Sequence, residues 1–417
     1  MTETCIIAAK RTPQGRFLGA LKKLSAVELA LRAGAAALDG IDHSRIDEVI
    51  VGNVLSAGQG MNIARQIGIK LGLPISVPAF TVNMMCASGM QSVLLADRAI
   101  RSGNARAVLC GGTESMSNAP HLLPRSRAGF PLGDAVLVDS LLRDGLVDSF
   151  DNRHMGLTAE QLAGKYQLSR EHQDEFALES QSRWNEAHRA GVFESELVPL
   201  DELAHDEHPR PETTRESLAN LKPAFDTAGT VTAGNASGIN DGAALLLLAD
   251  REYADQQGWP ILAVLAGSAS VGCDPDEMGL GPVHATRQLC EKLGVELSSF
   301  DQIELNEAFA AQALACLKEL NLNVGPVVPA NERDSTIEAG TTGPTKNLNP
   351  HGGAIALGHP IGTTGARLLT HLAHQIAQGK GQTALATLCV GGGMGVAVAL
   401  RGSTTKDTNH TNEDSTN

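Results

Sequence analysis

The stretch SGMQSVLLADRAIRSGNARAVLCGG, residues 88–112, decides the fold, because its pattern returns late in the chain as TGARLLTHLAHQIAQGKGQTALATLCVGG, residues 364–392. In each copy a small residue and a glycine begin an apolar stretch with helical spacing, and a glycine ends it. A short apolar run closed by two glycines follows. We therefore expect helices over 88–100 and 364–377, and strands over 107–110 and 384–389.

A second, weaker pair of matching segments supports the repeat. Residues 47–53 and 301–306 are extended apolar runs, and each follows an apolar helical pattern, over 27–38 and 285–293. Two halves with a shared β-α-β-α-β order predict an α/β protein built as two similar layered halves packed together. We predict an N-terminal domain from 1–116 plus 226–260, a C-terminal domain over 261–402, and a polar, disordered tail over 403–417.

The segment between the halves, residues 117–225, has a different composition. It is rich in Arg, His, Asp and Glu and contains one clear helical pattern, over 169–190, which Ser169 begins as a candidate N-cap and Gly191 ends. We interpret it as an inserted loop domain that supplies a lid or a ligand surface.

Composition excludes several classes of protein. The net charge of −14 argues against nucleic acid as a partner, although local basic residues can still bind phosphate. Seven scattered cysteines do not form a disulfide framework and fit a reducing compartment. The N-terminal residues lack the pattern of a signal or transit peptide, and no apolar stretch reaches the length of a membrane span. We expect a cytoplasmic protein with no membrane partner.

Cys86 is the first candidate for chemistry. It lies between an extended run, residues 79–83, and the helix that begins at Ser88. The positive end of a helix dipole favours the thiolate form, which makes a cysteine nucleophilic. An isolated cysteine is more often a small buried hydrophobic residue. The helix start and the adjacent Ser-Gly favour the nucleophile.

Cys389, His359 and Asn306 are the other candidates. Cys389 ends an apolar strand and is followed closely by Gly391–Gly393, where the backbone N–H groups can approach a ligand oxygen. Cys110 has a similar strand but no comparable motif, so we interpret it as structural. His359 precedes a proline, which places it at an extended turn and not in a helix. Asn306 follows a strand and, taken alone, predicts a helix N-cap.

Taken together, these motifs resemble the thiolase family. The resemblance covers nearly the whole chain, and no single motif carries it. The ordered set is IAAKRTP (7–13), NMMCASG (83–89), GGTESM (111–116), HMGLTAE (154–160), GTVTAGNASG (229–238), NEAFA (306–310), GGAIALGHP (352–360) and CVGGG (389–393).

The resemblance implies an acetyl-CoA C-acyltransferase. Cys86 would attack an acyl-CoA thioester while His359 accepts its proton, and Cys389 would then remove a Cα proton from a second acetyl-CoA for a Claisen condensation. The reverse reaction is thiolysis of a 3-ketoacyl-CoA. Asn306, through a water, and His359 would stabilise the enolate oxygen, and the backbone N–H groups of Cys86 and Gly391 would form a second oxyanion hole. No permanently bound cofactor and no metal are expected, with CoA and acetyl-CoA as substrates.

The resemblance also implies CoA contacts. The nucleotide would lie beside Arg210, Ser217 and Leu218. The pantetheine arm would pass Phe225, Ala233 and Ser237. The reactive end would be lined by His154, Met155, Met278 and Phe309. Arg210 lies between two prolines and is equally compatible with an ordinary loop residue.

The chain departs from the family pattern in three places. The separation of Asn306 and His359 is longer than expected, with a polar surplus around 325–346 that reads as a surface loop. His351 stands where the family pattern predicts Asn. Met84 and Met85 replace a more polar pair and could shift the preference for acyl chains.

Three other functions are compatible with parts of this sequence. One is a thiolase of broader chain length in fatty-acid β-oxidation. Another is a decarboxylating ketoacyl synthase, which typically pairs its cysteine with two histidines and lacks a second catalytic cysteine. A third is a non-catalytic acyl-CoA or lipid carrier, which predicts loss of the catalytic residues. By resemblance we expect a homodimer or homotetramer, with residues 79–82 as a candidate interface.

Overall fold

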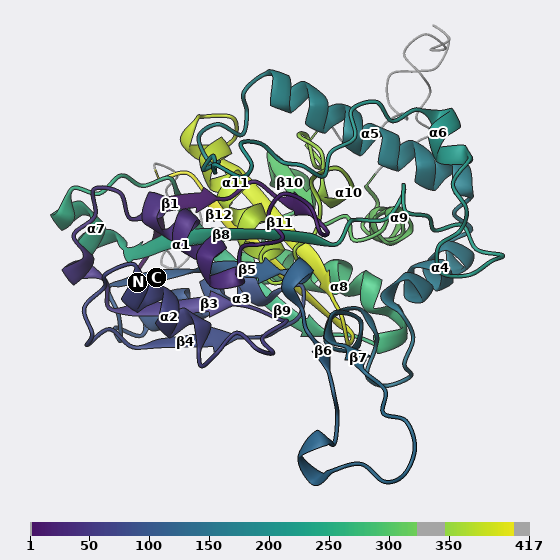
Figure 1. Ribbon diagram of the computed structural model, residues 1–417. Helices are drawn as coiled ribbons and strands as arrows, with labels where there is room; N and C mark the ends of the chain where they lie inside the picture. Colours follow the sequence, from purple (N-terminus) through teal and green to yellow (C-terminus); the bar gives the residue numbers. More distant parts are fainter. Residues whose placement is uncertain (1, 323–346, 404–417) are drawn as a thin grey trace, which may run out of the picture.

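The computed structural model describes residues 2–322 and 347–403 (Figure 1). The polar insert over 325–346 and nearly all of the predicted tail over 403–417 lie outside the described residues.

The N-terminal half and its insertion contain eight strands and seven α-helices among the described residues. In chain order these are β1 (Thr4–Arg11), β2 (Gly15–Arg16), α1 (Ala26–Ala37), β3 (Glu48–Gly52), α2 (Ile63–Lys70), β4 (Ala79–Val82), α3 (Ser88–Arg101), β5 (Ala107–Ser115), β6 (His121–Leu122), β7 (Val138–Asp139), α4 (Met155–Lys165), α5 (Arg170–Arg189), α6 (Arg215–Ala219), β8 (Asn240–Asp250) and α7 (Arg251–Gln257).

The C-terminal half follows the same plan. Its elements are β9 (Ala263–Gly272), α8 (Gly281–Leu293), β10 (Gln302–Leu305), α9 (Ala310–Glu319), α10 (Ala354–Leu357), α11 (Thr364–Ala377), β11 (Thr383–Val390) and β12 (Met394–Arg401). The helix predicted over 364–377 is confirmed residue for residue. The strand predicted over 107–110 is too short, because β5 continues through its two glycines to Ser115.

Strand pairing confirms the repeat. In the N-terminal half β8 lies antiparallel between β1 and β5, and β5 pairs in parallel with β3. In the C-terminal half β12 lies antiparallel between β9 and β11, and β11 pairs in parallel with β10. A short antiparallel contact between β1 and β9 joins the two sets into one continuous path of strands.

Helices α3 and α11 form the middle layer of the molecule. Both lie in one apolar core with the inner faces of the two halves, including Leu246 of β8 and Leu388 of β11. Alternate residues of the same strands face outward: Leu245 packs in the core that α1 and α2 cover, and Leu385 packs in the core that α8 and α9 cover. The order is therefore helices, sheet, helices, sheet, helices, as the repeat predicted.

The middle layer is close-packed at a glycine crossing. A Cβ atom added to Gly365 of α11 would lie 2.5 Å from the Cβ of Met90, and one added to Gly89 of α3 would lie 2.8 Å from the carbonyl oxygen of Gly362. The two helices can approach this closely only because glycine at each of these contacts leaves out a Cβ atom. The crossing fixes α11 against α3, and both helices begin beside the candidate catalytic residues.

The insertion covers one end of this layered body. Helix α5, capped by Ser169 as predicted, lies with α4 and α6 over that end (Figure 1). The segment between β6 and β7 projects from the body as an arm (Figure 1), with exposed Leu132, Val136 and Leu137. None of the helices in residues 2–322 and 347–403 is long and apolar enough to cross a bilayer.

Candidate active site

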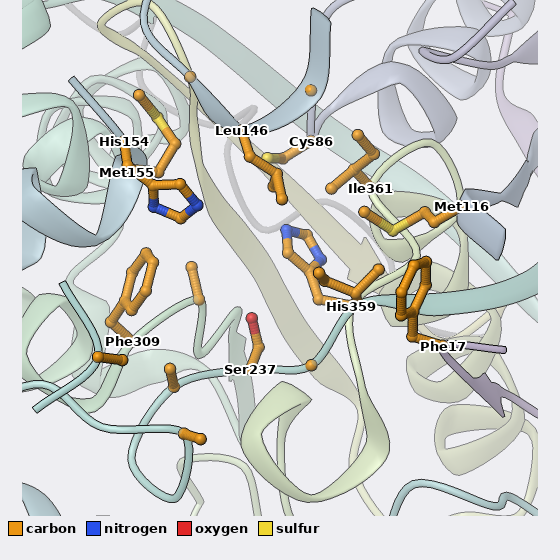
Figure 2. Close-up of a pocket in the computed structure, with 18 of the residues that line it drawn as sticks. Phe17, Cys86, Met116, Leu146, His154, Met155, Ser237, Phe309, His359 and Ile361 are labelled. Atoms are coloured by element: carbon orange, nitrogen blue, oxygen red, sulfur yellow. The ribbon is translucent and has the colours of Figure 1, made fainter. Parts of the chain in front are cut away.

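A cavity of about 460 Å³ opens where the insertion meets the two halves. It brings together most of the predicted site residues, from all parts of the chain: Cys86, His154, Met155, Arg210, Phe225, Ala233, Ser237, Met278, Phe309, His359, Cys389 and Gly391. In Figure 2, His154, Met155 and Phe309 line one side, and Phe17, Met116 and Ile361 line the other, with Cys86 and His359 between them.

Cys86 lies in a tight turn between β4 and α3. Met85 before it has a left-handed backbone (φ 46°), which is uncommon for a non-glycine residue. Ser88 holds the turn: its hydroxyl accepts from the N–H of Met84 at 2.9 Å and donates to the carbonyl of Met85 at 2.7 Å. The backbone is therefore bent so that the thiol enters the cavity.

The expected activation of Cys86 by the helix is corrected. Burial is the main cause that raises the pKa of Cys86 to about 11, and the nearby carboxylate of Glu114 acts in the same direction. Hydrogen bonds from the backbone N–H groups of Gly391 and Cys86 lower it, but by less than burial raises it. The free thiol is thus protonated at neutral pH and needs a base to become a nucleophile.

Cys389 lies near the end of β11 and is buried, and burial raises its pKa well above the usual value. The neighbouring Cys86 raises this pKa as well, and both cysteines line the same cavity. The glycine turn after it is required at Gly393, where φ is 84° and an added Cβ would lie 2.5 Å from the carbonyl oxygen of Cys273. Cys110 is buried in the apolar core away from the cavity, as predicted.

His359 is buried between α10 and α11, at the extended turn that its proline predicted. The backbone N–H of His359 donates to the side-chain oxygen of Asn240 at 3.0 Å. The ring nitrogen Nδ1 lies 2.6 Å from Oγ1 of Thr364. The other ring nitrogen, Nε2, is buried without a hydrogen-bond partner in the part of the chain that the structure describes. Burial lowers the pKa of His359 to about 4, with a smaller contribution from Arg367. The imidazole is neutral at pH 7 and can accept a proton.

Asn306 is not an N-cap, which is the role that its residue type taken alone would favour. Helix α9 begins at Ala310, with Phe309 at the cap position, so Asn306 lies in the link after β10. Its N–H donates to the carbonyl of Thr387 at 2.9 Å, while both atoms of its side-chain amide are buried and lack a protein partner among the described residues. A buried amide in that state requires a water or a ligand. It does not line the cavity as a wall residue.

Ser217 and Leu218 are not brought into the cavity. The hydroxyl of Ser217 takes part in a capping box with Thr214 at the start of α6, and Leu218 is buried. Arg210 does reach the cavity mouth, where Arg16 and His208 join it. Arg16 forms an ion pair with Glu207, with 3.5 Å between the two side chains.

Glu114 is a residue that the sequence analysis missed. It is fully buried and accepts hydrogen bonds from the N–H groups of Val54, Leu55 and Gly362, at 2.9, 3.2 and 3.0 Å. Burial raises its pKa to about 7 despite these donors. It ties the turn after His359 to the N-terminal half. The signal was present, since a carboxylate among GGTESM in an otherwise apolar strand needs buried partners.

The apolar wall of Phe17, Met116, Leu146 and Ile361 was also missed. These residues come from four separate segments with no shared motif, and they pack with Met85 and Cys86 or line the same cavity. Short-range sequence patterns cannot bring such segments together. On the opposite side His154 stacks on Phe225, with ring centroids 4.7 Å apart, and Phe225 meets Phe309 edge to face.

Family models match both halves of this architecture. The model described as "Thiolase, N-terminal domain" matches residues 4–252, and that described as "Thiolase, C-terminal domain" matches residues 259–402. The chain belongs to the thiolase family. The resemblance inferred from the motifs is thereby confirmed.

The similar proteins cover nearly the whole length of the chain. An acetyl-CoA acetyltransferase of Chromobacterium violaceum is 47% identical over 409 residues, covering 95% of this chain and 99% of the relative. The solved structure of human mitochondrial 3-ketoacyl-CoA thiolase in complex with CoA is 40% identical, with a TM-score of 0.89, covering 97% and 98% of the two chains. The acetyl-CoA acetyltransferase of Bacillus anthracis is 38% identical, with a TM-score of 0.88, covering 96% and 99%.

Proposed function

We propose that this thiolase is an acetyl-CoA C-acyltransferase that condenses two acetyl-CoA molecules to acetoacetyl-CoA and catalyses the reverse thiolysis. The observation that carries the proposal is the meeting of two thiols and a neutral, unpartnered imidazole nitrogen in one cavity. The relatives named acetyl-CoA acetyltransferase, at 44–47% identity, support the same chemistry.

In the first half-reaction Sγ of Cys86 bonds to the acyl carbon of acyl-CoA while Nε2 of His359 accepts the thiol proton. The bond between the acyl carbon and the CoA sulfur breaks. Cys389 donates its proton to the departing thiolate, so that free CoA leaves and Cys389 remains as a thiolate beside the charged imidazole. The N–H groups of Gly391 and Cys86, which already reach Sγ of Cys86, suit the acyl oxygen.

In the second half-reaction the thiolate of Cys389 removes a Cα proton from acetyl-CoA. The carbanion bonds to the acyl carbon on Cys86, the bond from that carbon to Sγ breaks, and Cys86 recovers its proton from His359. The Nε2–H of His359 and a water held by the unpartnered amide of Asn306 would stabilise the enolate oxygen meanwhile. The two half-reactions together balance: two acetyl-CoA molecules give acetoacetyl-CoA and free CoA, and each side chain regains its starting protonation state.

Different residues of the cavity suit different parts of the substrate. Arg210 and Arg16 at the mouth suit the phosphates of CoA, and Ala233, Ser237 and Phe225 suit its pantetheine arm. The solved human thiolase that carries CoA supports this ligand. Ser217 and Leu218 stay in the proposal as nucleotide neighbours that would act from α6.

A broader range of chain lengths is a second candidate, favoured by the apolar wall of Phe17, Met116, Leu146 and Ile361 beside Cys86. Such a wall suits an acyl chain longer than acetyl. Thiolysis rates over 3-ketoacyl-CoA substrates of four to sixteen carbons would separate the candidates: a rate confined to four carbons excludes the broader range.

The proposed assembly is a homodimer or homotetramer in the cytoplasm. Strand β4 is one edge of the sheet, and the other edge, β10, is bordered by a bridge from Ile303 to Leu348. The exposed apolar arm between β6 and β7 offers a second, separate surface, as a dimer of dimers requires. Seven free thiols suit a reducing compartment.

The proposed domains are an N-terminal domain of residues 1–116 plus 226–260, a loop domain of residues 117–225 and a C-terminal domain of residues 261–402.

The test is intact-mass analysis after incubation with acetyl-CoA. We expect one acetyl adduct on the wild type and on Cys389→Ala, and none on Cys86→Ala. Cys110→Ala, which removes a buried thiol distant from the cavity, is the matched control and should keep the adduct. No adduct on the wild type, from acetyl-CoA or from any 3-ketoacyl-CoA, would contradict the proposal.

A further inference from the structure

We infer that Thr364 is the positioning residue of His359: its hydroxyl accepts a hydrogen bond from Nδ1–H, which leaves Nε2 as the free base directed at the cavity. The inference rests on the proposed function, since it assigns the proton-accepting atom of that reaction. It concerns a residue that touches no substrate and acts through the imidazole.

The geometry of Thr364 restricts where its own proton can go. Oγ1 of Thr364 lies 2.6 Å from Nδ1 of His359 and 3.0 Å from the carbonyl oxygen of Pro360. A carbonyl oxygen can only accept, so the bond to Pro360 uses the hydroxyl proton. The remaining partner, Nδ1, must then donate. The neutral ring has a single N–H, and Nε2 is therefore unprotonated.

The other side of the ring agrees with this assignment. Nε2 is buried and has no protein donor or acceptor in the described residues, and His359 lines the cavity together with Cys86. An unpartnered lone pair in a buried site is costly unless a donor arrives with the substrate or from the nucleophile. The thiol of Cys86 is such a donor, and the first half-reaction consumes the lone pair.

Two hydrogen bonds fix the backbone that carries the ring. The N–H of His359 donates to Oδ1 of Asn240, and Nδ2 of Asn240 donates to the carbonyl of Gly15 at 2.9 Å, which fixes the amide. Gly358 has φ 95°, and an added Cβ would lie 2.4 Å from Asn240. Thr364 itself begins α11, the helix locked at the Gly365 crossing. The hydroxyl thus belongs to a helix that close packing at Gly365 holds in place.

The first test is ¹⁵N NMR of the histidine rings in the whole protein, which needs no substrate. The His359 signals are assigned by their loss in His359→Asn. We expect the shifts of the Nδ1–H form in the wild type and in Thr364→Ser, and a mixture of both tautomers in Thr364→Val. A wild-type ring with the proton on Nε2 would overturn the inference, even if the enzyme is active.

The second test is the rate of Cys86 acetylation followed by rapid quench and intact mass. Thr364→Val should slow acetylation by roughly 10- to 100-fold, the range expected for partial loss of general-base catalysis. Thr364→Ser, which keeps the hydroxyl, should restore it to within about threefold of the wild type, since only a methyl group is lost.

Thr370→Val is the matched control, because Thr370 is equally buried on α11 and its hydroxyl has no partner in the part of the chain described. It should leave the rate unchanged. Equal slowing by Thr364→Val and Thr370→Val, or failure of the serine to rescue, would show a packing effect and overturn the inference. An inert wild type with the expected tautomer would instead count against the proposed function alone.

Discussion

At the scale of single residues, the pair Cys86 and His359 makes a prediction about pH. A thiol with a pKa of about 11 is only about one part in ten thousand thiolate at pH 7. With His359 as the base, alkylation of Cys86 by iodoacetamide should be nearly independent of pH between 5.5 and 9. The rate should fall as the pH drops toward 4, because His359, whose pKa is about 4, becomes protonated.

His359→Asn provides the contrast. Without the base only the thiolate reacts, so the rate should rise about tenfold per pH unit across the same range. Mass analysis of the alkylated peptide checks both proteins. If the wild type shows the same slope as His359→Asn, the imidazole does not take the thiol proton.

The catalytic residues could be found from sequence because each lies in a short glycine-framed motif with a local reason to be there. Their acid strengths could not. The helix after Cys86 predicted a lowered pKa, but burial dominates and raises it. Burial depends on Leu146, Ile361 and Met155, which come from distant segments. The unprotonated state of Nε2 of His359 could not be predicted from sequence either. It follows from the contact between His359 and Thr364, which only the folded structure shows.

At the scale of elements, the crossing of α3 and α11 should tolerate no added methyl group. Gly365→Ala would push its Cβ to 2.5 Å from Met90 and displace the first turn of α11, which carries Thr364. We expect a loss of about 2 to 3 kcal/mol of stability, the cost of overpacking, together with slower acetylation of Cys86. Thermal unfolding and the quenched acetylation assay measure the two effects.

Gly164→Ala is the matched control for this prediction. Gly164 is also helical, in α4, but an added Cβ would meet nothing within 4 Å. The alanine should stabilise the protein by about 0.5 to 1 kcal/mol, because it restricts the unfolded chain. Comparable behaviour of the two substitutions would show that the glycine crossing does not limit the packing of α11.

Element boundaries were predictable where the local signals agreed. The small residue, glycine and apolar period of 364–377 gave α11 without error, and Ser169 gave the start of α5. The residue type of Asn306 alone would place the start of a helix there, whereas α9 begins four residues later, at Ala310. Strand β5 continues past its two glycines to Ser115, because the strand is buried along its whole length.

At the scale of the whole molecule, buried histidines should make the protein sensitive to acid. Burial lowers the pKa of His351 and of His359 to about 4, below the value near 6.5 of an unfolded chain. Between those values the unfolded state binds more protons than the folded state. Stability should therefore fall as the pH drops from about 6.5 toward 4.

His351→Asn isolates one part of this effect and restores the residue type that the family pattern predicts. Asparagine does not titrate, so the decrease in Tm between pH 7 and 5 should be smaller by up to about 2 °C, an upper bound because the imidazole is partly exposed. His172→Asn, at an exposed position of α5, should not change the slope. An unchanged slope in His351→Asn would exclude His351 as a source of acid sensitivity.

The layered body also predicts how two copies meet. Strand β4 ends the sheet, and the amide of Asn62 donates to the carbonyl of Ala79 on it at 2.9 Å. Phe80 on that strand is 39% exposed, and Ile75 and Met61, which precede the strand, are 84% and 90% exposed. An apolar open edge is a template for pairing with another chain. We expect this edge to be the contact between two copies.

Phe80→Lys places a charge on that edge and should weaken the dimer by at least tenfold, since a lysine must either be desolvated or keep the edges apart. Sedimentation velocity across a dilution series measures the change. Leu132→Lys adds the same charge to the arm between β6 and β7 and should leave the pair at β4 intact, at most separating a tetramer into dimers. If Leu132→Lys yields monomers and Phe80→Lys does not, the copies meet through the arm, and the open edge of β4 serves another purpose.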